Sequence, residues 1–185
     1  MSTDDDLQTP EELAVLYGPA SAYEGAEIWL KAIYEAGDFR LAWRSMAPAY
    51  RLCRAQAWLY NNRNHPTFRT VDLDSVAQTF IVDEPHHGEW VHFAESELRL
   101  FQSSLSNFSL TRYGAGSRPR PIDLNHTLLI FMDVDGEPTL ITQSTLIEGV
   151  HLVIMELTES GWQVAQFGSD RLPMPGWPPN LYPEV

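Results

Sequence analysis

Residues 22–63 read AYEGAEIWLKAIYEAGDFRLAWRSMAPAYRLCRAQAWLYNNR, an almost continuous helical sequence. Ser21 and Glu24 form an S-x-x-E capping box at its start, and Gly37 is suited to end the first helix. After Asn107 the pattern changes to alternating and β-branched runs separated by hairpin turns. Helices first and a meandering sheet last predict an α+β domain, in which a strongly curved antiparallel sheet wraps around a helical layer.

The helical signals also give the expected helix boundaries. The main helix carries a stripe of apolar residues that includes Trp29 and Ile33, which is the spacing of one buried face. Asp38 caps the next helix, and Pro48 ends that helix and begins another, because proline fits only the first helical turn. We expect helices over residues 22–36, 39–46 and 49–62, from Asp72 or Asp74 to about residue 81, and over about 88–104.

The second half of the chain predicts strands and a tail. Asp135-Gly136 is the strongest short hairpin signal and joins two long strands, while Glu159-Ser160-Gly161 joins the last two. We expect strands over residues 108–113, 124–134, 138–147, 150–157 and 162–168. Residues 170–185 form a tail that is too proline-rich for the interior of a sheet. Residues 21–169 are then one domain, preceded by an acidic segment, 1–20, with a short helix.

Composition limits the kind of protein. The 185 residues, 44% of them hydrophobic, are enough for one domain with a sizeable core. No apolar run approaches the ~20 residues that cross a bilayer, so no membrane partner is expected. The N-terminus is acidic and polar, the reverse of a signal peptide, and the single Cys53 fits a reducing compartment. We therefore expect a cytoplasmic protein.

The net charge of −13 is unevenly distributed. Residues 1–38 carry −8, residues 39–71 carry six arginines and no acid, and the remainder carries −11. A strongly acidic chain lacks the basic face that nucleic acid requires, so no nucleic-acid partner is expected. The arginine block has two interpretations, an anion-binding site or pairing with acids of neighbouring helices, and we favour pairing.

Two short motifs resemble a known superfamily. At the end of a long helix, Gly37-Asp38-Phe39-Arg40-Leu41-Ala42-Trp43 resembles the turn between the first two helices of the nuclear-transport-factor-2-like superfamily. Near the end of the chain, Gly161-Trp162-Gln163-Val164 is similar to the last strand of many members. The resemblance covers residues 21–169. It implies a cystatin-like cone, a curved antiparallel sheet holding three helices, with a pocket at its open end. Members include ketosteroid isomerases, scytalone dehydratases, SnoaL-like polyketide cyclases, limonene epoxide hydrolases and many proteins without enzymatic activity. This chain adds an N-terminal helix, a long helical segment at 64–105 and the tail, so no member's active site is carried over.

The segment 83–92, DEPHHGEWVH, is the richest in titratable residues. His87 or His92 with a neighbouring carboxylate is suited to general acid–base catalysis. Glu89-x-x-His92 has the helical spacing of a metal-binding pair, but Glu148-x-x-His151 crosses Gly149 within a strand, so a second motif of that geometry is missing and no metal is expected. The simpler interpretation, which we favour, is a polar loop and helix start.

His126, Asp133 and His151 lie in predicted strands, where alternate side chains face opposite ways. The helix-facing set is therefore either His126, Leu128, Ile130, Met132 and Val134, or Thr127, Leu129, Phe131 and Asp133. A buried Asp133 would have a raised pKa and serve as a base, although an acid beside a hairpin turn is more often solvated.

The remaining candidates are aromatic residues of a pocket wall. The candidate ligand-binding residues are the aromatic residues Tyr34, Trp58, Tyr60 and Trp90, together with His126 from a predicted strand. At helical spacing such residues are usually core, which we expect for Trp29 and Trp43. Cys53, in a helix that looks buried, is expected to be an inert thiol.

Three functions remain open. The first is a small-molecule-binding or non-enzymatic protein with a mostly apolar pocket, needing no cofactor and dimerising through its sheet. The second is a cofactor-independent lyase, isomerase or cyclase acting on a small hydrophobic metabolite, with His87 or His92, then His151, as the base. The third is an interaction module whose tail docks on a partner. Phosphate-binding loops, serine-hydrolase elbows and zinc-spaced Cys/His sets have no counterpart in the sequence.

Overall fold

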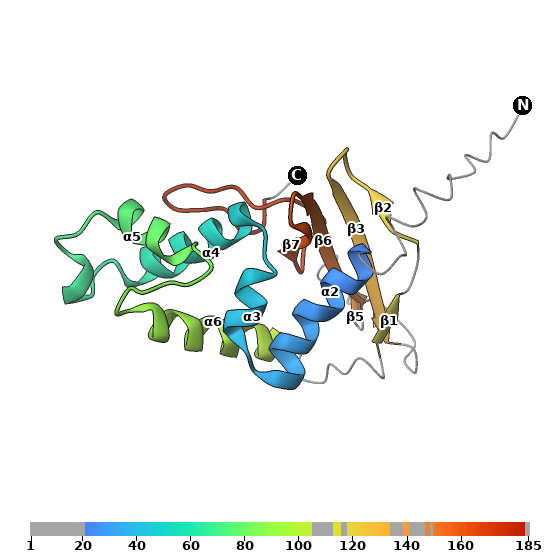
Figure 1. The fold of residues 1–185 in the computed structure, drawn as a ribbon, viewed down its shortest axis with the longest axis horizontal. Helices are drawn as coiled ribbons and strands as arrows, with labels where there is room; N and C mark the ends of the chain where they lie inside the picture. Colours follow the sequence, from blue (N-terminus) through green and yellow to red (C-terminus); the bar gives the residue numbers. More distant parts are fainter. Residues whose placement is uncertain are drawn as a thin grey trace, which may run out of the picture.

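The computed structural model describes residues 21–104, 113–115, 118–133, 139–140, 147–148 and 150–183 (Figure 1). Helices form one half of the molecule and a sheet the other. This confirms the α+β class, with an open antiparallel sheet. The helical elements are α2 (Ala22–Lys31), the π-helical turn η1 (Ala32–Ala36), α3 (Phe39–Arg44), α4 (Pro48–Asn62), the 3-10 turn η2 (Pro66–Phe68), α5 (Leu73–Phe80) and α6 (Trp90–Ser104).

The predicted capping residues end and begin these helices. Ser21 Oγ accepts a hydrogen bond from the Glu24 N–H at 3.2 Å, and Gly37 takes the left-handed conformation (φ 63°) that ends η1. Asp38 accepts from the Leu41 N–H at 3.0 Å, and Pro48 stands at the start of α4. Local sequence therefore fixes these boundaries.

Two helix boundaries differ from the prediction. α3 ends at Arg44 because the following residues pair with β7 instead: the Val164 N–H donates to Ser45 O and the Ala47 N–H to Val164 O, both at 2.8 Å. α6 begins at Trp90 rather than at about 88, and the residues before it form a turn in which the Trp90 N–H donates to the His87 carbonyl at 3.0 Å and the Glu89 N–H donates to His87 Nδ1 at 3.1 Å.

The main sheet has the order β1–β3–β6–β7, and β2 also pairs with β3. Its strands are β1 (Tyr113–Ala115), β2 (Arg120–Pro121), β3 (His126–Asp133), β6 (Val150–Thr158) and β7 (Gly161–Phe167). A separate pair consists of β4 (Thr139–Leu140) and β5 (Ile147–Glu148). The hairpin between β6 and β7 through Glu159 and Ser160 is confirmed.

The predicted pairing of strand 124–134 with strand 138–147 is wrong in the described residues. β3 pairs with β6 along one edge, with Leu129 opposite Val153, and with β1 and β2 along the other. Burial decides this pairing, because it places the apolar faces of β3 and β6 on the same side of the sheet. The turn Asp135-Gly136, most of the strand predicted at 108–113 and the segment 1–20 lie outside the described residues.

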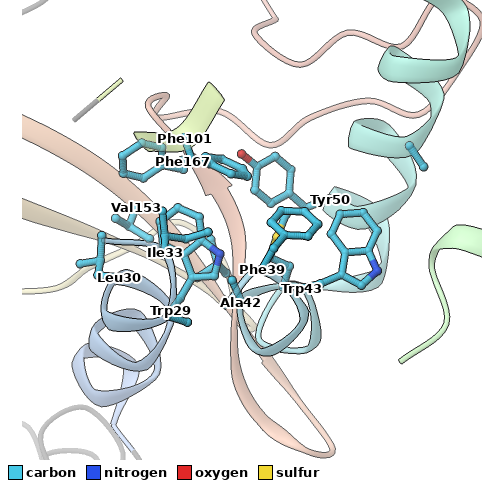
Figure 2. Packing of buried hydrophobic residues seen from close by; sticks show 14 of the residues in the cluster. Trp29, Leu30, Ile33, Phe39, Ala42, Trp43, Tyr50, Phe101, Val153 and Phe167 are labelled. Carbon is cyan, nitrogen blue, oxygen red and sulfur yellow. The ribbon is translucent and has the colours of Figure 1, made fainter. Parts of the chain in front are cut away.

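The helix-facing set of β3 is the one that contains Thr127, Leu129 and Phe131, all buried. Tyr23 of α2 meets Phe131 at 6.0 Å between ring centroids. Trp29 packs against Phe101 and Phe167, each at 5.1 Å, and Figure 2 shows these rings grouped with Leu30 and Ile33. The interface between α2 and the sheet is thus packed with aromatic side chains in the described residues.

Residues 171–183 fold back over the helices as a hairpin closed by an antiparallel bridge between Met174 and Asn180. This segment, the strap, is the red loop that reaches toward α5 in Figure 1. The Gly176 N–H donates to Gln56 Oε1 at 2.9 Å, and Trp177 Nε1 donates to Asp74 Oδ1 at 2.8 Å. The tail therefore docks on α4 and α5 of its own chain. Among the described helices, none has the length and apolar character to cross a membrane.

Candidate functional site

An open groove of about 330 Å³ is lined by residues from the end of α4, from η2 and the residue before it, and from the start of α6 and the residue before it. Figure 1 shows α4 and α6 in the helical half of the molecule. We call it the α4–α6 groove. Its aromatic side is formed by Trp58 and Phe68, whose rings meet edge to face at 5.7 Å. The polar residues that line the groove are Asn62, His65, Glu89 and His92.

The α4 and η2 side of the groove follows from helical spacing and capping. Trp58 and Asn62 are four residues apart on α4, and Asn62 Nδ2 donates to the Trp58 carbonyl at 2.8 Å. His65 begins η2, where its Nδ1 accepts the Thr67 N–H at 3.4 Å. A neutral His65 with Nδ1 engaged as an acceptor carries its proton on Nε2, so it offers a hydrogen-bond donor.

The opposite side comes from the segment of histidines and acids. Glu89 and His92, three residues apart, both line the groove. His87 does not line it: its Nδ1 accepts the Glu89 N–H at 3.1 Å, and its ring lies edge-on to Phe80 at 5.3 Å. His87 therefore positions the first turn of α6, while the Glu89 carboxylate has no ion-pair partner among the described residues.

Arginines of the block 39–71 hold the segment before α6 in place. Arg51 binds the Asp83 carboxylate at 2.7 Å, and Arg44 contacts the Asp83 carbonyl and Glu84. Arg54 forms a buried pair with Glu97 at 2.5 Å. These contacts confirm pairing for half of the block. Arg63 and Arg69 donate instead to the backbone carbonyls of Tyr60 and Asn64.

Only two of the predicted site residues line the groove, Trp58 and His92. Trp90, 5% exposed, belongs to the core, where its ring lies within 6 Å of those of Phe39, Trp43, Phe80 and Phe93. Tyr34 donates to the Phe101 carbonyl at 2.7 Å, and burial raises the pKa of its hydroxyl. The Arg63 guanidinium lies over the ring of Tyr60, with Cζ 4.1 Å from the ring centroid.

The strand candidates lie elsewhere in the sheet. His126 Nδ1 contacts the Asp123 carboxylate at 2.8 Å, in an exposed turn. His151, on β6, stacks on Phe167 at 6.4 Å, and burial lowers the pKa of its imidazole to about 4. The backbone of Asp133 pairs with Tyr113, and its side chain lies outside the described residues. The predicted catalytic set His87, His92, His151 and Asp133 therefore contributes only His92 to the groove.

Sequence reasoning missed Asn62, His65 and Phe68 as groove residues. The run Asn61 to Pro66 predicts only the end of the helix expected over 49–62, and nothing in it shows that α6 lies opposite. The chemical environment of Cys53 agrees with the prediction, because the thiol is buried and burial raises its pKa to about 12.

The groove lacks the ligand set of a metal centre. In the described part of the chain, no three His, Cys, Asp or Glu residues come together as a metal-binding group. The arrangement offers instead an aromatic surface, one carboxylate, one amide and two imidazoles, which suits hydrogen bonding and proton transfer. The chain matches no protein-family model, no curated protein and no solved structure.

Proposed function

We propose that this protein binds a small organic molecule in the α4–α6 groove. The observation that carries the proposal is that one groove is lined by an aromatic surface, Trp58 and Phe68, and by the Glu89 carboxylate, which has no ion-pair partner among the described residues. Ligand sites commonly combine apolar walls with a few oriented polar groups in this way. The volume of about 330 Å³ suits a ligand of one or two rings.

Indole, a neutral two-ring probe, tests this proposal. We expect indole to shift the NMR signal of the Trp58 indole N–H, which a W58F variant assigns. H92W places a large ring in the groove and should abolish the shift. The matched control V91W adds the same ring at the neighbouring position of α6, which is 57% exposed and does not line the groove, and should leave the shift in place. Equal responses in both variants would contradict the proposal.

A second candidate function is a cofactor-independent lyase, isomerase or cyclase. It is favoured by one observation, that His92 and Glu89 line the same groove and so combine an imidazole with a carboxylate. This proposal requires the imidazole of His92 within about 3 Å of the proton to be moved in a bound ligand. A complex in which His92 lies beyond hydrogen-bond reach of the ligand would contradict catalysis and leave binding intact.

The finer expectations about fold and assembly remain proposals. A cone of the nuclear-transport-factor-2-like type is supported by helix α2 packed on one face of an antiparallel sheet that ends the domain. A homodimer through the sheet is supported by half-buried apolar residues, Leu128, Ile130 and Met132, on the face opposite α2. The buried single thiol of Cys53 supports a cytoplasmic location.

A further inference from the structure

We infer that the α4–α6 groove selects an organic cation, a primary ammonium group attached to an aromatic body. This inference rests on the proposed function and names the ligand class of the same site. It depends on three features of the groove: an unpaired carboxylate, an aromatic surface beside it, and hydrogen-bond acceptors already oriented by their neighbours.

The carboxylate is Glu89. Its backbone N–H is held by His87 Nδ1 at 3.1 Å, so the residue is fixed in place at the start of α6. No described cation pairs with the carboxylate, although Asp83, Glu84 and Glu97 on the same stretch of chain each have an arginine partner. A carboxylate beside an aromatic wall is suited to hold an ammonium group that is partly shielded from water.

The aromatic surface adds to this preference. The indole of Trp58 presents a π face that attracts cations, and Trp is the strongest aromatic partner for them. Phe68 and Phe93 each contact the Trp58 ring edge to face, at 5.7 and 5.8 Å between ring centroids, which restricts the motion of the indole. A ligand ring can therefore lie against Trp58 while its ammonium group reaches Glu89.

The amide of Asn62 also favours a donor-rich ligand. Because Asn62 Nδ2 donates to the Trp58 carbonyl, the Oδ1 atom is the acceptor that remains. The nearest arginines in sequence do not reverse this balance, since Arg63 lies on the Tyr60 ring, Arg69 donates to Asn64, and neither lines the groove. The net charge of −13 further raises the local concentration of cations.

Indole, tryptamine and indole-3-acetate share one ring system and differ in charge, so their affinities test the inference. We expect tryptamine to bind about fivefold more tightly than indole, and indole-3-acetate more weakly than indole, as judged by NMR titration of the Trp58 indole N–H at mildly alkaline pH. The variant E89Q should remove the advantage of tryptamine over indole. The control E95Q makes the same charge change on an exposed part of α6 outside the groove and should preserve it.

The outcomes separate the two proposals. If indole binds but tryptamine binds no more tightly, or keeps its advantage in E89Q, the cation preference is wrong and the binding function stands. If none of the three molecules shifts the Trp58 signal, both proposals are overturned. Urea unfolding of E89Q and E95Q establishes that both variants are folded before they are compared.

Discussion

His151 shows how one side chain ties stability to pH. Its ring lies on Phe167 within the sheet, where burial lowers the pKa of the imidazole from 6.5 to about 4. Well above pH 6.5 the imidazole is neutral in both the folded and the unfolded chain, so it does not make the unfolding free energy depend on pH. Between pH 6.5 and about 4 the unfolded chain takes up a proton that the folded chain refuses, so stability falls as pH falls.

We predict that H151Q removes this part of the acid sensitivity. The wild type should lose about 1–2 kcal/mol of unfolding free energy relative to H151Q over this pH range, an estimate reduced for the partial exposure of the ring. Urea denaturation at several pH values measures the difference. H86Q, which removes an exposed histidine, should follow the wild type. Parallel curves for wild type and H151Q would show that His151 is protonated in the folded protein.

The residue scale also shows where prediction from sequence succeeds. Ser21, Gly37, Asp38 and Pro48 act through their own backbone or through atoms within four residues, so their roles were predictable. The role of His87 was not, because a histidine in the sequence does not show whether its nitrogen will meet a substrate or the N–H two residues later. The sequence shows which chemical group His87 carries, but it does not show which atom that group contacts.

At the scale of elements, α2 packs closely against β7 at Gly25. A Cβ atom on Gly25 would lie 2.8 Å from the backbone oxygen of Trp162 and 3.1 Å from Met155 Cε. Glycine at this position lets the helix lie directly on the sheet. Since the nearest atom belongs to the backbone, a larger residue must displace the strand or the helix.

We predict that G25A destabilises the protein although alanine favours helices. The gain in helix propensity, about 1 kcal/mol, is outweighed by the forced separation of α2 from β7, and we expect a net loss of about 1–3 kcal/mol. Thermal or urea unfolding measures it. G88A is the control, because nothing lies within 4 Å of a Cβ there, and it should change stability by less than about 0.5 kcal/mol. An unchanged or raised stability of G25A would rule out this close packing.

Element pairing marks the limit of what the sequence predicted. The hairpin between β6 and β7 depends on a short turn and was predicted, whereas the partner of β3 depends on which face is buried across distant segments. The α4–α6 groove has the same non-local origin. Trp58 lies in α4, while His65 and Glu89 directly precede η2 and α6. These segments are brought together by non-local contacts such as the packing of Phe68, Phe80 and Phe93 around Trp58.

At the scale of the whole molecule, the strap joins the C-terminus to the helical half. Gln56, 4% exposed with the strap in place, accepts a hydrogen bond from the Gly176 N–H, which is lost if the strap detaches. Gln166 Nε2 donates to the Leu181 carbonyl, and the Leu181 side chain packs against the main core. These contacts satisfy polar groups of α4 and β7 as well as covering apolar surface.

We predict that removing residues 171–185 lowers the unfolding free energy by about 2–5 kcal/mol, from the lost burial of Leu181 and the lost hydrogen bonds of Gln56 and Gln166 to the strap. The single variant L181A should cost about 1–3 kcal/mol, while M174A, at a side chain that is 55% exposed, should cost little. Urea unfolding of the three proteins measures these differences. If the tail served only to bind a partner, the truncated chain would be as stable as the full one.

Because the strap contacts α4, α5 and β7 together, its loss should also increase amide exchange in α5, which packs mainly against α4.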